Sequence, residues 1–349
     1  MRADRSSAER WRPATAGWTG LCRLAVVLGV VLGTALAQQG PSVGAAGADA
    51  RGLRRTRLNG VVSSTSLSNI NQNDARAAIK VWFDLVAQRK GFVLDSKVDI
   101  LNSVAEIRER LQSHSVELLV LNIAEYLELE SSHLVFPALT HAVSLQGGSL
   151  YSYVLLAKPS SAAATLAGLR GKNILVFSRS GSNAGMAWID VSLGREKLGR
   201  AASFFASVKA ADKAQACILP LFFGTVDACV VDELNLNLAK EMNPQLGQLR
   251  VIARSRPMIG SVIATPIEPS PYQNDLLDTI LSLHEDARGR QLLMVFKTDR
   301  VVRVQPGDLD PARELWRDYS RLPASSPVRL PGPTTAAESS PPDRAKERD

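Results

Sequence analysis

The chain is poor in aromatic residues and in cysteine, and its excess of basic residues is small. Of its 349 residues, 5% are Phe, Trp or Tyr and three are cysteine. The formal charge of +7 includes +3 from the first 37 residues, where five arginines face two acids, which leaves about +4 on the remainder. Because this charge is mild and no stripe of basic and aromatic residues accompanies it, we expect no nucleic-acid partner.

The sequence also lacks a long hydrophobic run. Spanning a bilayer takes about 20 apolar residues, and every apolar run in this chain is shorter. The run Leu24–Ala37 follows several arginines and ends in Ala35-Leu36-Ala37. Basic residues, a short apolar run and an A-x-A site are typical of a secretory signal. We therefore expect cleavage near Ala37 and a periplasmic mature protein, with an uncleaved anchor as the alternative.

Of the cysteines, Cys22 belongs to the signal segment and should be removed with it. Cys217 and Cys229 fall in a predicted apolar helix and a predicted apolar strand. An exported pair could oxidise, but thiols in such elements often serve as small buried hydrophobic residues. We expect two separate thiols, with a disulfide as the alternative.

Low-complexity segments enclose the part expected to fold. Residues 38–56 are rich in Gly, Ala and Ser and predict a flexible leader, whereas residues 321–349 are rich in Pro and predict a disordered tail.

Predicted strands and helices alternate between these ends. The stretch Asp74–Ala87 has apolar residues at helical spacing and lies between the predicted strands Leu58–Ser63 and Lys97–Leu101. A helix with a capping box at Ser103 follows, and then the buried strand Val116–Leu121. This β-α-β-α-β order predicts a parallel sheet with helices on both faces.

The same alternation restarts after the extended segment Leu150–Ala157. An α/β fold of two lobes is therefore predicted, with residues 57–157 and 262–320 in the first lobe and 158–261 in the second. The chain would cross between them, as a hinge, near Tyr151–Lys158 and Arg256–Ala264. The other predicted strands are Asn173–Phe177, Ser203–Val208, Val226–Val231, Arg250–Ala253 and Ser261–Thr265, and the other helices are Asn183–Leu193, Ala211–Phe223, Glu233–Met242, Tyr272–Leu283 and Ala287–Phe296.

A polar turn follows the strand that ends at Phe177 and begins the next helix. Unpaired backbone N–H groups and the positive end of the helix dipole meet at such a position and favour an anion. The alternatives are a simple helix cap at Ser182 and a nucleophile elbow, but in Gly181-Ser182-Asn183-Ala184-Gly185 the serine comes one place too early for G-x-S-x-G. The candidate ligand-binding residues of this turn are Ser180, Gly181, Ser182 and Asn183.

Three further predicted strands also end in polar residues. In parallel α/β sheets ligands gather at the carboxyl ends of the strands. We therefore expect these residues to complete a small-ligand site with the turn, without a cofactor or a metal, although a loop and two N-caps are the alternatives. They are Ser63, Ser64 and Thr65 after the first strand, Asn122 after the third, and Asp232 before the helix Glu233–Met242.

Several of these segments resemble the corresponding sequences of the solute-binding receptors of phosphate, phosphite and phosphonate ABC importers. The matching pieces include Gly60–Ser66, Val116–Asn122, Leu169-Arg170-Gly171-Lys172 and Gly224-Thr225-Val226-Asp227-Ala228. The family's Ser-Thr-Ser-Gly motif falls on Ser182–Gly185, where one hydroxyl is lost and another is replaced by an amide.

The resemblance implies a type II periplasmic-binding fold and a monomeric, non-catalytic receptor. Such a receptor would capture a small oxyanion or phosphonate-like solute between its lobes and deliver it to an ABC permease. It also implies that Asp232 and Glu233 could accept the amine of a zwitterionic ligand. The alternatives are a sensor or scaffold subunit that signals to a membrane partner, and an enzyme acting in the same cleft.

Overall fold

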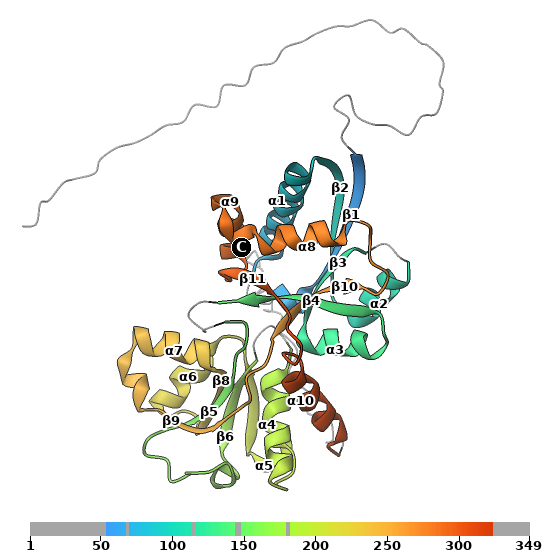
Figure 1. Cartoon of the computed structure of the whole chain (residues 1–349). Coiled ribbons are helices and arrows are strands. Elements are labelled where there is room, and N and C mark those ends of the chain that lie inside the picture. The colour runs from blue at the N-terminus through green and yellow to red at the C-terminus, as the bar shows by residue number, and fades with distance from the viewer. Residues whose placement is uncertain (1–53, 68–69, 114–115, 144–147, 179–181, 324–349) are drawn as a thin grey trace, which may run out of the picture. The chain divides into compact units, whose positions relative to one another are not determined.

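The computed structural model describes residues 54–67, 70–113, 116–143, 148–178 and 182–323, all within the unit Gly47–Asp349 (Figure 1). The predicted signal segment, most of the leader and the tail beyond Pro323 lie outside these residues.

A mixed sheet forms the first half of the fold. β1 pairs in parallel with both β2 and β3, which confirms the predicted parallel core, and β10 and β11 join antiparallel. In the order β11-β4-β10-β3-β1-β2, its strands are β1 (Arg54–Ser63), β2 (Phe92–Leu101), β3 (Leu118–Asn122), β4 (Val135–Ala142), β10 (Ser261–Pro266) and β11 (Arg300–Arg303).

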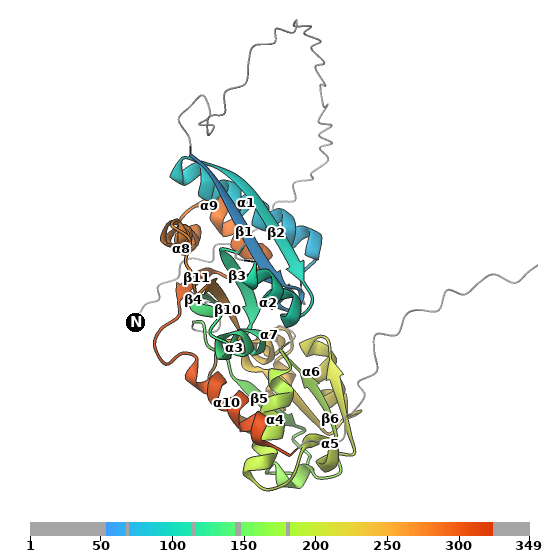
Figure 2. The same ribbon diagram turned by 90° about the vertical axis from the view of Figure 1, so that its right-hand side faces the viewer.

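Successive side chains along the buried strand β3 point to opposite faces of this sheet, and each face is covered by different helices. Leu118 packs in the cluster that holds Phe83 of α1, whereas Leu119 packs in the cluster that holds Ile107 of α2 and Tyr126 of α3. Successive side chains of a strand point to opposite faces, so one strand supports two helical layers. One layer consists of α1 (Gln72–Lys90), α8 (Gln273–Leu281) and α9 (Ala287–Val295), and the other of α2 (Val104–Gln112) and α3 (Ile123–Ser131) (Figure 2).

A second sheet is built in the same way. β6 is parallel to β7 and β8, and β5 is antiparallel to β8 and β9. Its order is β7-β6-β8-β5-β9, with strands β5 (Tyr153–Ala157), β6 (Asn173–Phe177), β7 (Ser207–Ala211), β8 (Ala228–Asp232) and β9 (Arg250–Arg254). Its helices are α4 (Ala184–Arg195), α5 (Ala201–Phe204), α6 (Ala214–Phe223) and α7 (Glu233–Met242).

Two expectations about this sheet need correction. We placed residues 153–157 in the first lobe, but as β5 they pair with β8 and β9 in the second sheet. We also expected a strand over Ser203–Val208, yet Ala201–Phe204 is a helical turn and β7 begins at Ser207. The turn is stabilised by Asp190, whose carboxylate accepts from the backbone N–H of Ala201 at 2.7 Å, a tertiary contact that local sequence does not reveal.

The two segments that connect the sheets pair with each other. Tyr151 and Met258 form an isolated antiparallel bridge, with N···O distances of 3.0 and 2.9 Å. Gly260 lies beside it, and a Cβ there would stand 2.6 Å from the Tyr151 ring, so this close approach requires glycine. A backbone bridge of this kind keeps the two crossings adjacent where we predicted the hinge.

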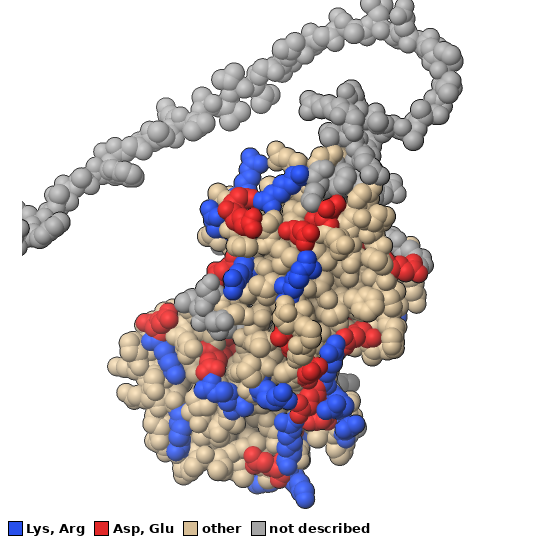
Figure 3. Space-filling view, viewed as in Figure 1, with Lys and Arg blue, Asp and Glu red and all other residues tan. Residues whose placement is uncertain are grey.

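Helix α10 (Asp310–Arg321) follows β11 and lies against α4 (Figures 1 and 2). Arg195 of α4 donates to Glu314 at 3.0 Å and to Asp318 at 2.7 Å. At the start of α10, Arg313 pairs with Glu130 of α3. Figure 3 shows the result on one face, where basic and acidic side chains stand side by side. α10 is therefore tied by ion pairs to helices of both sheets.

Glu130 gives the stability of the fold a pH dependence. Burial raises the pKa of Glu130, but hydrogen bonds from Arg313 and Tyr126 outweigh burial and hold the pKa below its ordinary 4.5. Because this pKa is depressed, ionised Glu130 contributes fully to the stability of the fold above pH 4.5. The contribution is lost as the pH falls through the folded-state pKa.

Glu130→Gln should therefore cost about 0.5–1 kcal/mol at pH 7, since the pair is partly exposed, and nothing measurable at the lowest pH at which the protein stays folded. Urea unfolding of both proteins from pH 7 down to pH 3 measures this. Asp310→Asn, which removes an exposed partner of the same Arg313, is the control and should show a smaller difference. A cost that is constant with pH would contradict the ion-pair account.

Cys217 and Cys229 form a disulfide rather than the two separate thiols we expected. Their Cα atoms lie 5.7 Å apart, within the usual range for a disulfide, and both residues are fully buried. The sequence did not reveal this because helix α6 and strand β8 each explain a buried cysteine without a partner. The pairing arises from packing α6 directly on β8.

This disulfide closes a short loop, with a sequence separation of 12. In the chain-entropy model such a loop is worth about 3 kcal/mol, so the Cys217→Ala, Cys229→Ala double variant should lose about that much free energy of unfolding in urea. Two alkylatable thiols in the denatured but unreduced protein, counted by mass spectrometry, would refute the disulfide.

Candidate functional site

The polar residues at the ends of β1 and β3 converge on a buried carboxylate, Glu125 of α3. Ser63 donates to its Oε1 at 2.6 Å, and Thr65 donates to the same oxygen at 2.8 Å. Asn122 in turn donates through Nδ2 to the Thr65 hydroxyl at 2.7 Å. The structure thus brings Ser63, Thr65 and Asn122 together around an anion that belongs to the protein.

Glu125 holds this position because it closes a capping box at the start of α3. Its backbone N–H donates to Asn122 Oδ1 at 3.0 Å, and its Oε2 accepts from the Asn122 backbone N–H at 3.1 Å. The N-cap alternative for Asn122 is therefore observed. The signal was present in the sequence, because Asn followed three residues later by Glu is a capping-box pattern. We missed Glu125 by treating Asn122 alone. Ser64, in the 3-10 turn Ser64–Leu67, is half-buried beside this network.

The polar turn of the second sheet leads into α4. Ser182 is 4% exposed, and its hydroxyl accepts from the backbone N–H of Ala184 at 3.3 Å. Asn183 is the N-cap residue, with a left-handed backbone (φ 53°) and an exposed side chain. Ser180 and Gly181, the other two candidates in this turn, lie outside the described residues. Ser182 therefore accepts one N–H of the first helical turn from the position before the N-cap.

Gly185, at the second position of α4, permits a close approach to β6. A Cβ there would lie 2.8 Å from the Phe177 carbonyl oxygen and 3.3 Å from the ring of Tyr153. The Gly185 N–H donates to the Ser178 hydroxyl at 3.1 Å. The first turn of α4 is thus held tightly against the carboxyl end of β6.

Asp232, at the end of β8, is fully buried and caps α7. Its Oδ1 accepts from the backbone N–H of Asn235 at 3.0 Å, and its Oδ2 accepts from Asn235 Nδ2 at 2.7 Å. Its neighbour Glu233 pairs with Arg254. Because β6 and β8 are parallel neighbours, Asp232 and the start of α4 lie at the same edge of the second sheet.

Aromatic residues stand beside this edge, and sequence analysis did not single them out. Tyr153 pairs in register with Asp232, and its ring stacks on Trp188 of α4 at 6.3 Å between centroids. Tyr151 meets Tyr153 edge-on at 5.3 Å. Tyr151 in the bridge and Tyr153 at the first position of β5 thus connect the two crossings to α4.

Metal-binding clusters and membrane-spanning helices are absent from the described residues. Among the described residues, no cluster of His, Cys, Asp or Glu could hold a metal ion, and none of their helices combines the length and apolarity needed to cross a membrane.

Comparison with known proteins decides the family. Residues 66–309 match the model of the phosphonate periplasmic substrate-binding proteins of ABC transporters. The chain belongs to this family. The match runs from the 3-10 turn after β1 to the residue before α10, so it includes the second sheet and every strand of the first sheet except β1. No curated protein sequence matches the chain.

Solved structures of this family and of similar proteins share the type II periplasmic-binding fold. A Xanthomonas citri protein bound to ATP has a TM-score of 0.59 at 14% identity, and the match covers 76% of this chain and 97% of the Xanthomonas chain. PhnD1 from Prochlorococcus marinus, in complex with methylphosphonate, scores 0.53 at 12% identity, with 76% and 99% covered. A binding protein component of an ABC phosphonate transporter from Pseudomonas aeruginosa scores 0.52 at 17% identity, with 76% and 87% covered. At these identities the likeness shows the fold alone.

The Glu125 network should contribute to the stability of this family member. Glu125→Ala would leave the fully buried Ser63 hydroxyl and Thr65 without their acceptor, and we expect a loss of about 2–4 kcal/mol in the free energy of unfolding. Glu128→Ala is the matched control on α3, because its ion pair with Arg108 is exposed and should cost less than about 1 kcal/mol. Equal costs in urea unfolding would show that the buried network adds nothing.

Proposed function

We propose that the protein captures a small phosphonate-like oxyanion and delivers it to an ABC permease. The observation that carries the proposal is the polar start of α4, which follows a parallel strand in a chain of the phosphonate-binding family. Backbone N–H groups and the positive helix end favour an anion there. The anion would bind at Ser182 and Asn183, with Ser180 and Gly181 completing the turn.

The internal carboxylate argues for this placement of the anion. Glu125 already accepts the hydroxyl hydrogens of Ser63 and Thr65, so the first sheet presents a negatively charged network rather than open donors. A second anion beside it would be repelled and would find its donors engaged. The negative group of the ligand therefore belongs on the second sheet, at α4.

The same charges favour a zwitterionic ligand. Asp232 and Glu233 lie at the same sheet edge as the start of α4, and Glu125 ends the network of the first sheet. Carboxylates attract an ammonium group and repel a second anion. Among phosphonates, an aminoalkylphosphonate should bind more tightly than an alkylphosphonate of the same length.

Closure would occur about the paired crossings. The Tyr151–Met258 bridge joins the two segments, and small changes in their backbone angles can move two lobes as rigid bodies. A micromolar dissociation constant corresponds to a binding free energy of about 8 kcal/mol, and each hydrogen bond to a charged group contributes about 1.5–3 kcal/mol. About five donors suffice, so binding requires no metal and no covalent step. We place this receptor in the periplasm as a monomer, with its signal cleaved near Ala37.

A ligand screen by thermal shift tests this function. A ligand that binds only the folded protein raises the melting temperature with the logarithm of its concentration. We expect 2-aminoethylphosphonate to raise it most, methylphosphonate, phosphite and phosphate less, and sulfate least. Ser182→Ala should weaken binding by about 1.5–3 kcal/mol in calorimetry.

The matched control is Ser103→Ala, which removes the serine N-cap of α2, a helix of the other sheet. Both variants lose a serine hydroxyl that accepts a backbone N–H at a helix start, but only Ser182→Ala should lose affinity. Equal affinity of the two variants would argue against the α4 site. No response to any of these anions would favour the sensor or scaffold alternative.

A further inference from the structure

A cavity of about 190 Å³ lies between the first sheet and the helices α1, α8 and α9, and it reaches the two crossings at Tyr151 and Gly260. It is distinct from the start of α4, which belongs to the second sheet. Most of its lining is apolar and comes from the core cluster that joins this helical layer to the sheet. Representative lining residues are Val62, Ile79, Val120, Ile280, Leu293 and Phe296.

The size of this cavity is large for a packed interior. Native cores contain few voids larger than a water molecule, and an apolar cavity of about 150 Å³ is enough to bind benzene. The cavity can therefore hold a ring or a short alkyl chain.

Two buried hydrogen-bond donors line the cavity without a protein partner. Trp82 of α1 is 9% exposed, and its indole Nε1–H makes no hydrogen bond. The hydroxyl of Ser66, in the turn after β1, is likewise buried and unpaired. Most buried polar groups have partners because leaving them unsatisfied is costly. Both groups can be satisfied by an oxygen that accepts hydrogen bonds.

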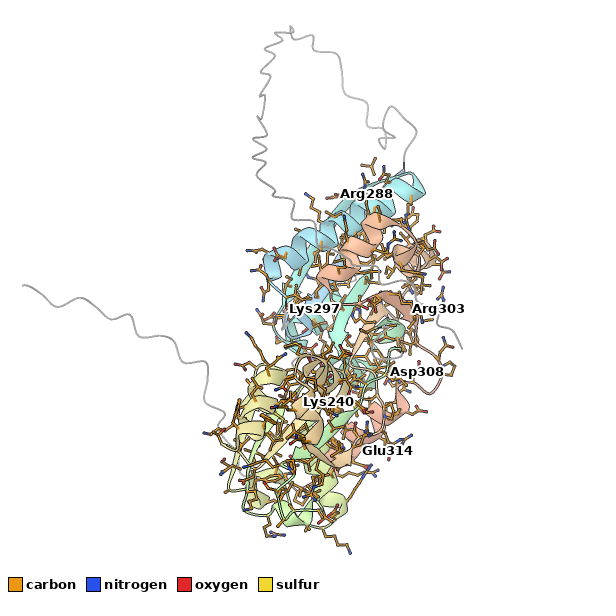
Figure 4. All side chains as sticks on the ribbon, turned by 90° about the vertical axis from the view of Figure 1, so that its left-hand side faces the viewer. Lys240, Arg288, Lys297, Arg303, Asp308 and Glu314 are labelled. Atoms are coloured by element: carbon orange, nitrogen blue, oxygen red, sulfur yellow. A yellow bond between two sulfur atoms is a disulfide. The ribbon has the colours of Figure 1, made fainter. Side chains whose placement is uncertain are left out.

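The other polar residues of the lining agree with such an acceptor. The described lining also includes the residues His141 and Lys297, the latter just after α9 (Figure 4), but no Asp or Glu. A ligand cation would meet no counter-charge, whereas an oxygen acceptor would meet donors.

We propose that this cavity is a second binding site, for a small amphipathic molecule with an apolar body and one acceptor oxygen. The apolar body fills the space between the sheet and the helices, and the oxygen accepts from Trp82 Nε1 and from the Ser66 hydroxyl. Aromatic or medium-chain ketones have this chemistry. The proposal stands apart from the oxyanion site, since it uses other residues and another class of ligand.

The test compares acetophenone with ethylbenzene, which differ chiefly in the acceptor oxygen. Binding is followed by calorimetry and by the NMR resonance of the Trp82 indole N–H, assigned from its absence in Trp82→Phe. We expect both compounds to bind and acetophenone to move the Trp82 resonance. Trp82→Phe, which keeps a ring but removes the donor, should weaken acetophenone about fivefold and change ethylbenzene less than twofold. Trp316→Phe, in the half-buried α10, is the control and should change neither.

A blocking variant tests the location independently of the hydrogen bond. Val301 of β11 lines the cavity, and Val302 beside it points to the opposite face of the strand. Val301→Phe should abolish the binding of both compounds, and Val302→Phe should leave it unchanged. If Val301→Phe does not fold, the Trp82→Phe comparison decides alone. The proposal is overturned if neither compound shifts the Trp82 resonance at millimolar concentration, or if Trp82→Phe weakens both compounds equally.

Discussion

The carboxylate of Glu125 is the interaction on which the polar edge of the first sheet depends. It joins the end of β1, the turn after it and the start of α3 through hydrogen bonds of 2.6 to 3.1 Å. A buried carboxylate is tolerated only when its oxygens are satisfied, so these hydroxyl and amide donors are fixed in place by the need to satisfy it. The first sheet thereby acquires a fixed negative group where its parallel strands end.

This arrangement makes the two sheets chemically unequal. The first ends in donors that are already engaged, whereas the second presents a helix start beside the buried Asp232 and the rings of Tyr153 and Trp188. The negative group of the first sheet and the helix start of the second therefore differ in charge.

Packing on the two faces of the first sheet also differs. The face covered by α2 and α3 continues into the large core cluster that includes Tyr151 and Tyr153, and so reaches the crossings and the second sheet. The face covered by α1, α8 and α9 forms a separate cluster and contains the cavity. The cavity also reaches the turn after β1 at Ser66 and the crossings at Tyr151 and Gly260.

The alternation of apolar strands and amphipathic helices was sufficient to predict the parallel cores of both sheets, and β6 and α7 were predicted to the residue. This succeeded because burial on both faces of a parallel strand requires a continuous apolar run, which is a local property. The three predictions corrected above concern tertiary contacts. Asp190 caps the turn at Ala201, Cys229 meets Cys217, and β5 joins the second sheet by pairing with β8 and β9.

The candidate site also has features that local sequence predicts and features that only tertiary contacts decide. The sequence by itself determined the fold class, the polar residues at the strand ends and a helix start within one residue of Asn183, because strand periodicity and capping patterns act over a few residues. Only the tertiary structure decided that Glu125 would take the hydroxyls of Ser63 and Thr65, and that Trp82 would face a cavity without a partner. Those outcomes depend on which groups the fold brings within about 3 Å of each other, and residues 60 positions apart in the chain carry no local pattern that records it.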